Sequence, residues 1–452
     1  MDEYDWQLFG DVEMFLEELV KEFVKNQEFV SRFSKQIAAF TSTKLIDWID
    51  HIILPWGSEM QEKLTAFGFE HDTSIDAPDE LEVYSNNKSI FFPIILSNQS
   101  ERELVLHPEK LEHFIRSIGE GHNTEGEMYA PYRRCLIEED EKFKVSAIER
   151  RGYNGYQVQA AAEDIDQYQD AFDSFRLRRR RYEDSEEGME ALQNLVEEVA
   201  DGLKPARMAD AFFRAERIFW QSRDWAGQIQ KERQDKFGLG WGNHDHHTYR
   251  SSREHFMTLI AILETMGFSP RERFFAGESA GWGAQILEQQ ECKIVVFADI
   301  DISATEKEID FAHTELDEKE SLGTVGLWTA IHGESILEAG LHHLATRVDF
   351  AHAQKSLESF GVEVMKPFSD FSFLKQAFTG AKRRDVEKKR LDALLEEGFI
   401  GERSYDNFVE NGAIGSHLEV IERRQGFKGF NQDSVTAIIR ATDPRDYDVR
   451  RA

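Results

Sequence analysis

The 452-residue sequence is poor in cysteine and proline, and it contains no long apolar run. Its two cysteines, Cys135 and Cys292, cannot form the disulfide framework of a small secreted protein, which favours a reducing cytoplasm. The nine prolines are too few for long proline-rich linkers. No stretch approaches the roughly 18 consecutive apolar residues that cross a bilayer, and residues 1–20 lack the basic and apolar segments of a signal peptide. We therefore expect a soluble cytoplasmic protein without a membrane partner.

Positive charge is also scarce. Lys and Arg number 54 against 85 Asp and Glu, which gives a formal net charge of −31. Because nucleic-acid binding needs a cationic face, this balance argues against nucleic acid as the main partner. Arginines cluster at 176–181, but acidic residues follow at 183–187, so we expect a solvated helix face there.

The chain length predicts two to three domains, and an internal repeat indicates how they are built. Residues 147–156 read AIERRGYNGY and residues 420–430 read VIERRQGFKGF, so one inserted residue, Gln425, separates two matching tracts. Each tract follows a short alternating run that is typical of a β-strand. The repeat therefore predicts two structurally equivalent strand ends.

A second repeat lies at the starts of the units. Residues 50–70, 245–268 and 342–363 each run from an apolar strand into an amphipathic helix, a glycine turn and a second apolar segment. His51, His246 and His343 stand at the equivalent place on the three first strands. Further strands follow each start, so each unit is approximately βαβββ.

These patterns predict an α+β fold of repeated βαβββ modules with mixed sheets. The predicted divisions are a helical cap (1–40), a degenerate module (41–156), a helical connector (157–238) and two further modules (243–310 and 335–442). Because such modules usually close barrels in pairs, three copies leave the pairing partner of the first one open.

The two later modules carry the residues that suit a metal site. Each has His-x-x-x-Arg on its first strand, as His246 with Arg250 and His343 with Arg347. Two histidines and one carboxylate with open coordination positions are typical of non-haem iron(II) oxygenases. We therefore predict that His246 and His343 are metal ligands, whereas His51 belongs to a structural copy.

The third ligand is expected on the last strand, where Glu419 and Glu422 are both available. Since they are three residues apart, strand alternation places them on opposite faces. The Ile-Glu-Arg that contains Glu422 recurs at 148–150, whereas Ser146 stands at the place of Glu419. The shared Glu422 indicates an architectural role, so we predict that Glu419 is the ligand.

Four tracts resemble segments of 4-hydroxyphenylpyruvate dioxygenases. HHLATRVDFAHAQKSLESFGVEVM resembles their second iron-ligand segment, and HLEVIERRQGFKGFNQDSVTAII resembles their Glu-bearing strand, Gly/Phe turn and C-terminal helix. DHHTYR resembles the first-ligand segment, which implies His246 rather than His247, and FLKQAFT implies that Gln376 lies near the metal. The His-x-x-x-Arg pair and AGWGAQILEQ also resemble 2-oxoadipate dioxygenase/decarboxylases. Both families belong to the vicinal oxygen chelate superfamily.

The resemblance implies an Fe(II)-dependent dioxygenase that decarboxylates a 2-oxo acid with O2. Arg250, four residues after a ligand on one strand, faces the same side and is expected to bind a substrate carboxylate, and Arg347 is a second candidate. A lyase or isomerase that uses Zn, Ni or Mn without O2 is the alternative, and a metal-free binding module is a third. A homo-oligomer is compatible with the sequence, which does not identify the particular substrate.

Overall fold

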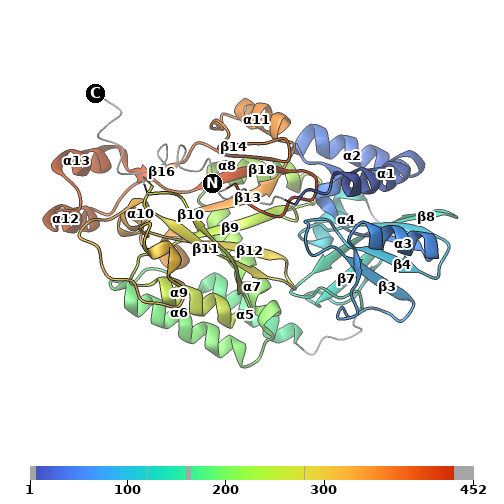
Figure 1. Cartoon of the computed structure of the whole chain (residues 1–452), viewed down its shortest axis with the longest axis horizontal. Helices are drawn as coiled ribbons and strands as arrows, with labels where there is room; N and C mark the ends of the chain where they lie inside the picture. The colour runs from blue at the N-terminus through green and yellow to red at the C-terminus, as the bar shows by residue number, and fades with distance from the viewer. Residues whose placement is uncertain (1–6, 120, 159–163, 279, 432–452) are drawn as a thin grey trace.

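The computed structural model describes residues 7–119, 121–158, 164–278 and 280–431, within which two eight-stranded mixed sheets lie side by side (Figure 1). Helices α1 (Gly10–Asn26) and α2 (Glu28–Thr41) form the predicted cap. Their buried residues recur every three or four positions, as Phe15, Leu19 and Phe23 do in α1, which gives each helix one apolar face. Those faces pack on the core of the N-terminal sheet.

The N-terminal sheet has the strand order β2-β3-β4-β1-β5-β8-β7-β6. Its strands are β1 (Ile49–Pro55), β2 (Glu70–His71), β3 (Leu81–Ser85), β4 (Ile94–Ser97), β5 (Arg102–Leu106), β6 (Thr124–Glu125), β7 (Tyr132–Glu139) and β8 (Phe143–Arg150). A short 3-10 helix η1 (Leu45–Trp48) precedes β1, helix α3 (Ser58–Ala66) follows β1, and α4 (Leu111–Ile118) follows β5. The segment 41–156 therefore contains two βαβββ modules, so its prediction as one module is wrong.

The C-terminal sheet repeats this order as β10-β11-β12-β9-β13-β18-β15-β14. Its strands are β9 (His244–Arg250), β10 (Ser269–Phe275), β11 (Gly283–Gln289), β12 (Ile294–Ile300), β13 (His343–Arg347), β14 (Ser369–Asp370), β15 (Leu374–Phe378) and β18 (His417–Arg423). Helices α9 (Phe256–Thr265) and α11 (Phe350–Ser359) follow β9 and β13. The α+β fold of repeated modules is thus confirmed, and the module at 41–156 finds its pairing partner within itself.

The two matching sequence tracts end equivalent strands, β8 and β18. Each continues through a glycine in the left-handed region, Gly152 at φ 62° and Gly426 at φ 66°. A Cβ on Gly152 would lie 2.3 Å from the carbonyl oxygen of Ala206, so only glycine fits there. The C-terminal helix that the resemblance implies after β18 falls in residues 432–452, which lie outside the described residues.

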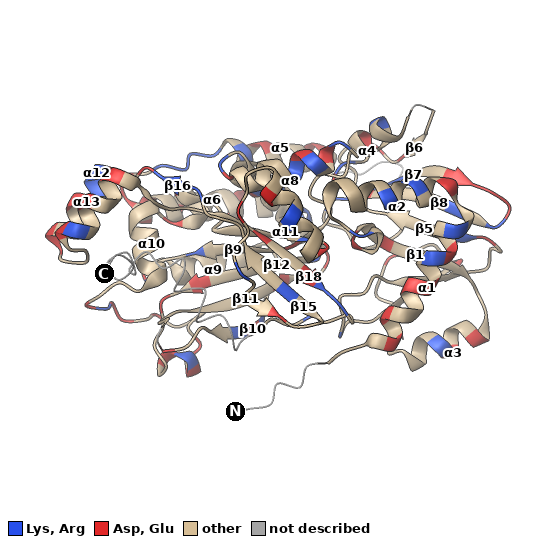
Figure 2. Ribbon diagram, turned by 90° about the horizontal axis from the view of Figure 1, so that it is seen from above, with Lys and Arg blue, Asp and Glu red and all other residues tan. Residues whose placement is uncertain are grey.

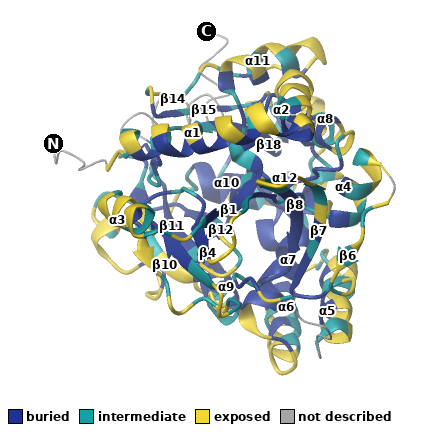
Figure 3. Ribbon diagram, turned by 90° about the vertical axis from the view of Figure 1, so that its right-hand side faces the viewer, coloured by how far each residue is buried: buried dark blue, intermediate teal, exposed yellow. Residues whose placement is uncertain are grey.

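The described part of the connector 157–238 forms helices α5 (Ile165–Leu177), α6 (Ser185–Ala200), α7 (Pro205–Gln221) and α8 (Trp225–Asp235). Helix α7 is buried along most of its length and shares a core with the C-terminal sheet. Figure 3 shows α7 and β8 in the buried colour and α3 in the exposed one. Through α7, the connector therefore packs against the C-terminal sheet.

A buried ion pair ties the connector to β9. Glu216 on α7 accepts hydrogen bonds from Arg178 (2.8 Å) and Arg180 (2.5 Å), and its other oxygen accepts one from the Tyr249 hydroxyl (2.9 Å). The arginine run at 176–181 was expected on a solvated face, but the side chains of Arg178 and Arg180 are only 4% and 10% exposed, and Glu216 compensates their charge. Elsewhere both acidic and basic residues lie on the outer helices (Figure 2).

Two segments between the C-terminal strands are helical. Residues 301–342 contain η2 (Glu306–Glu308), α10 (Thr324–His332) and the π-helical turn η3 (Ser335–Ala339). The charged insertion expected at 381–408 forms α12 (Lys388–Glu396) and α13 (Glu402–Asn411), flanked by the small strand pair β16 (Arg383–Arg384) and β17 (Ala413–Ile414), and packs on α10. Among the described helices, none combines the length and apolarity that a bilayer crossing requires.

Glu216→Gln should lower the free energy of unfolding by about 3–5 kcal/mol, because it leaves two buried guanidinium groups without a carboxylate. Burial raises the pKa of Glu216, but Arg178 and Arg180 outweigh this and hold it below 4.5. The stabilisation is therefore present above pH 4.5 and is lost as the pH falls. Urea unfolding followed by circular dichroism measures the effect. The exposed Glu190→Gln is the control, and equal midpoints for the two variants would contradict the assignment.

Candidate metal centre

The three predicted metal ligands lie together on three neighbouring strands. His246 is on β9, His343 on β13 and Glu419 on β18, and these strands are adjacent in the C-terminal sheet. Glu419 Oε2 lies 3.1 Å from the Nε2 atoms of both His246 and His343, and the two Nε2 atoms are 3.4 Å apart. All three side chains are buried. His246 thus lies beside two residues that are 97 and 173 positions further along the chain, His343 and Glu419.

Strand alternation explains why these residues meet and their neighbours do not. His247 points to the opposite face of β9, where its ring packs on Phe213 at 5.0 Å. Glu422 turns away from the centre, because it contacts Lys44 Nζ and accepts the backbone N–H of Phe350 at 3.0 Å. Those contacts are architectural, in keeping with the recurrence of Glu422 in the sequence repeat.

Each charge at the centre responds to the others. Burial lowers the pKa of His246, but the carboxylates of Glu419 and Asp245 outweigh burial and raise it to about 9. Burial raises the pKa of Glu419, but the two imidazoles, His246 first, hold it below its ordinary value. Burial lowers the pKa of His343. The pair of imidazoles and the carboxylate therefore form a compact group that favours an ionised Glu419.

The donor set fits a divalent cation. One ligand atom from each of His246, His343 and Glu419 lies within 4.8 Å of the others, so a single ion has access to all three. Two imidazoles and one carboxylate suit Fe(II), Zn, Ni or Mn. Gln376 on β15 donates its Nε2 to Glu419 Oε1 at 2.8 Å, which leaves Oε2 to face the imidazoles. Gln376 Oε1 is buried without a hydrogen-bond partner among the described residues.

Asp245 holds the first histidine from behind. Its carboxylate accepts hydrogen bonds from His246 Nδ1 (3.0 Å), from two nitrogens of Arg423 (2.9 Å each) and from Arg347 Nε (3.0 Å). A proton on His246 Nδ1 leaves the Nε2 lone pair directed at the centre, as a metal ligand requires. Arg347, the second candidate for a substrate contact, donates its Nε to the Asp245 carboxylate in the structure.

Two further histidines, His342 and His417, continue from the Nδ1 side of the His343 ring. His342 Nδ1 is 3.2 Å from His343 Nδ1, and His342 Nε2 is 3.3 Å from His417 Nε2. Burial lowers the pKa values of His342 and His417 well below 6.5, so both are neutral at pH 7. His342 therefore fixes the orientation of the His343 ring in the way that Asp245 fixes His246.

Arg250 lies on the ligand face of β9, as predicted. Its Nε is 3.8 Å from Asp299 on the adjacent β12, and its guanidinium lies over the Trp328 ring at 5.5 Å. Burial raises the pKa of Asp299 to about 7, although Arg250 and His246 oppose that rise. Arg250 is therefore a buried cation beside a carboxyl group that loses its charge readily.

Aromatic rings surround the ligands. Phe297 and Phe430 lie 4.8 and 5.4 Å from the His246 ring and 4.5 Å from each other, and Phe378 lies 5.1 Å from His343. These rings give the centre apolar walls that keep bulk water away. The sequence alone did not single out any of them, because Phe is common throughout the chain.

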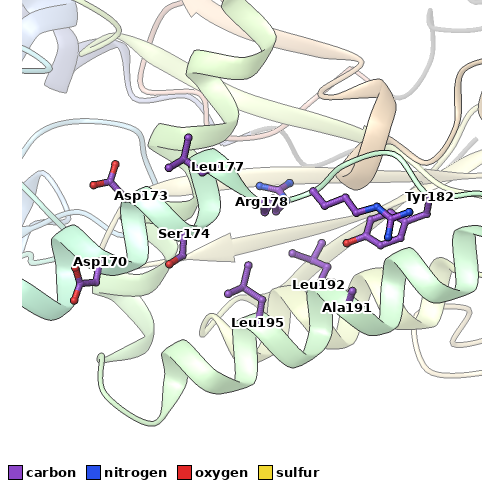
Figure 4. Close-up of a pocket in the computed structure, with 10 residues that line it drawn as sticks. Asp170, Asp173, Ser174, Leu177, Arg178, Tyr182, Ala191, Leu192 and Leu195 are labelled. Carbon is purple, nitrogen blue, oxygen red and sulfur yellow. The ribbon is translucent and has the colours of Figure 1, made fainter.

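One surface groove lies away from the candidate centre. It has a volume of about 740 Å³ and lies between α5 and α6, with Asp170 and Asp173 of α5 and Leu192 and Leu195 of α6 among its lining residues (Figure 4). None of its lining residues is among the predicted ligands. The metal centre is thus a buried group of side chains inside the sheet rather than a surface groove.

Comparisons with known proteins give structural likenesses only. No known protein-family model matches the chain, and no curated protein matches it. Similar solved structures include a mutant 4-hydroxymandelate synthase from Streptomyces coelicolor, at 11% identity and TM-score 0.28, with 88% of this chain and 98% of that one covered. A xylose isomerase-like TIM barrel/4-hydroxyphenylpyruvate dioxygenase fusion protein is 8% identical at TM-score 0.23, with coverages of 89% and 52%.

Methylmalonyl-CoA epimerase from Mycobacterium tuberculosis is also similar, at 11% identity and TM-score 0.23, with 40% of this chain and 87% of that one covered. At TM-scores below 0.5 these likenesses do not bear on activity, which the chain's own residues must indicate.

His246→Ala, His343→Ala and Glu419→Gln should each weaken divalent-metal binding by at least about 10- to 100-fold. Mutation of a residue that only hydrogen-bonds a metal ligand already costs about this much affinity. Anaerobic equilibrium dialysis of each purified variant against Co²⁺ measures this. Glu422→Gln is the matched control on the same strand, and it should lower stability while leaving metal affinity unchanged. Metal loss in Glu422→Gln with retention in Glu419→Gln would reverse the assignment.

Proposed function

We propose that the chain is an Fe(II)-dependent non-haem dioxygenase that decarboxylates a 2-oxo acid with O2. The observation that carries the proposal is the convergence of His246 Nε2, His343 Nε2 and Glu419 Oε2 within 3.4 Å of one another. Ferrous iron held by two imidazoles and a carboxylate supplies open positions for a chelating 2-oxo acid and for O2. The resemblance of the ligand-bearing tracts to 2-oxo acid dioxygenases supports the same reaction class.

Three residues of the chain keep the ligands in position. Asp245 orients His246, His342 orients His343 and Gln376 holds Glu419 through one oxygen. Since each partner fixes a side chain that already lies on a rigid strand, the ligands need little rearrangement to bind an ion. We assign these residues a positioning role, with Gln376 also close enough to the centre to contact a bound substrate.

Arg250 supplies the contact that would select the substrate. Its Cα is four residues along β9 from His246, about 13 Å at 3.3 Å per residue, so its guanidinium faces the far end of a substrate held at the ligands. A guanidinium forms a bidentate pair with a carboxylate. The proposal therefore favours a 2-oxo acid with a second, distal carboxylate. Such a group would replace Asp299 as the counter-ion of Arg250.

The apolar walls bear on the reaction as well. Phe297 and Phe430 cover His246, and Phe378 covers His343. Because water competes for open metal positions and reacts with activated species, a dry surrounding protects an oxidative reaction. The same rings leave apolar surface for the carbon chain of the substrate.

A metal-dependent lyase or isomerase is the second candidate. Two His and one Glu are also the ligands of catalytic zinc sites, in which the ion acts as a Lewis acid without O2. The ligand set alone favours neither metal, so the reaction itself must separate the two candidates.

Fe(II) protein supplied with the right 2-oxo acid should consume O2 and release CO2 in a one-to-one ratio. An oxygen electrode and a CO2 assay, run over a panel of 2-oxo monoacids and diacids, measure both quantities. Glu419→Gln is the inactive control. Turnover by Zn²⁺-loaded protein under strict anaerobiosis would overturn the dioxygenase proposal in favour of the lyase or isomerase.

Arg250→Lys should raise KM for 2-oxo diacids at least about tenfold more than KM for monoacids, because an ammonium group cannot form the bidentate pair. Steady-state kinetics on matched mono- and diacids give the ratio. Arg347→Lys is the control, since Arg347 contacts Asp245 and should affect both substrate classes alike. A diacid-selective rise of KM in Arg347→Lys, without one in Arg250→Lys, would contradict this assignment and indicate that Arg347 binds the distal carboxylate.

A further inference from the structure

The two large sheets correspond strand for strand, which allows their residues to be matched place by place. Both have the same strand order, and in both the central antiparallel pair has a register shift at the same point. Ile52 pairs with Leu104 on one side of the shift, as His247 pairs with Leu344 in the other sheet. The residue before Ile52, His51, therefore takes the place of His246.

The support behind the first histidine is repeated as well. Asp50 Oδ2 lies 2.7 Å from His51 Nδ1, and Arg150 forms two bonds with the Asp50 carboxylate at 2.8 and 2.9 Å. Asp245 and Arg423 make the same contacts behind His246. The N-terminal sheet thus holds its histidine in the orientation of a metal ligand.

The other two ligand places hold different residues. Strands β5 and β8 pair in the same parallel register as β13 and β18. That register puts Glu103 at the place of His343 and Ser146 at the place of Glu419. Glu103 still offers a buried carboxylate, whereas Ser146 removes an anionic ligand.

The side chain of Arg134 lies beside Glu103 and Ser146. Arg134 pairs with Ile148 as Gln376 pairs with Ile421, so Arg134 takes the place of Gln376. Its Nη2 donates to Glu103 Oε1 at 2.5 Å and lies 3.5 Å from Ser146 Oγ. The Arg134 guanidinium therefore contacts Glu103 and Ser146, the residues at the places of His343 and Glu419, and supplies positive charge there.

We propose that the N-terminal sheet contains a second, latent divalent-cation site, built on His51 and Glu103, in which the Arg134 guanidinium takes the place of the ion. Arg134 neutralises Glu103, and Ser146 makes room for the guanidinium. Restoring the residues of the C-terminal sheet, by Arg134→Gln with Ser146→Glu, supplies one imidazole and two carboxylates, a set that suits Mn²⁺, Fe²⁺, Co²⁺ or Zn²⁺.

The test is the number of Co²⁺ ions bound per full-length chain by equilibrium dialysis. This inference rests on the metal site proposed at His246, His343 and Glu419, so wild-type protein should bind one ion. Arg134→Gln/Ser146→Glu should bind two, and adding His51→Ala should return the number to one. Arg134→Lys/Ser146→Glu is the matched control, which keeps a cation in place and should bind one.

The outcomes separate the two proposals. A folded Arg134→Gln/Ser146→Glu variant that binds one ion overturns the latent site and leaves the proposed function standing. Wild type that binds none, with a variant that binds one, overturns the proposed function and leaves the latent site standing. If the double variant does not fold, the single variants test the proposal. Arg134→Gln should then lower the melting temperature more than Arg134→Lys, because only the lysine keeps a positive charge beside Glu103. Equal melting temperatures overturn the proposal that the positive charge of Arg134 takes the place of the ion.

Discussion

The centre depends on the buried carboxylate of Asp245. It joins three neighbouring strands, since it accepts hydrogen bonds from His246 on β9, Arg347 on β13 and Arg423 on β18. Burial raises the pKa of Asp245, but Arg423 and the other donors outweigh burial and keep it well below 3.8. A charged carboxylate at this point fixes the register of the strands and the tautomer of His246 at once. Without it, the buried guanidinium of Arg423 and the partly exposed one of Arg347 would lose their counter-ion.

Much of the fold follows from the sequence because the modules repeat. The matching tracts at 147–156 and 420–430 end equivalent strands, β8 and β18, and the helical cap and connector follow from helical periodicity. The number of modules in 41–156 did not follow. Its second module starts at β5, a five-residue strand without the histidine that marks the other starts, so the pattern gave no boundary there. Pairing across the sheet, rather than local pattern, separates the two modules.

The convergence of the three proposed ligands was predictable for a related reason. His246, His343 and Glu419 are residue types with chemistry of their own at places set by strand alternation. Asp299 and His342 were not found, because their roles arise from contacts across strands that no local spacing reveals. Arg347 was predicted as a substrate contact on its spacing alone, and spacing does not distinguish a side chain that turns to a neighbouring carboxylate.

Comparison of the two sheets separates architecture from function. Aspartate, histidine and arginine recur at the same places in both sheets, so this trio stabilises the fold whether or not a metal is bound. The registers also put Pro55 at the place of Arg250 and Ser97 at the place of Asp299. The proposed substrate contact is therefore absent from the sheet that has lost its ligands. A histidine bonded to Asp and Arg thus marks the first module of each sheet, and only the added carboxylate and imidazole mark the proposed metal site.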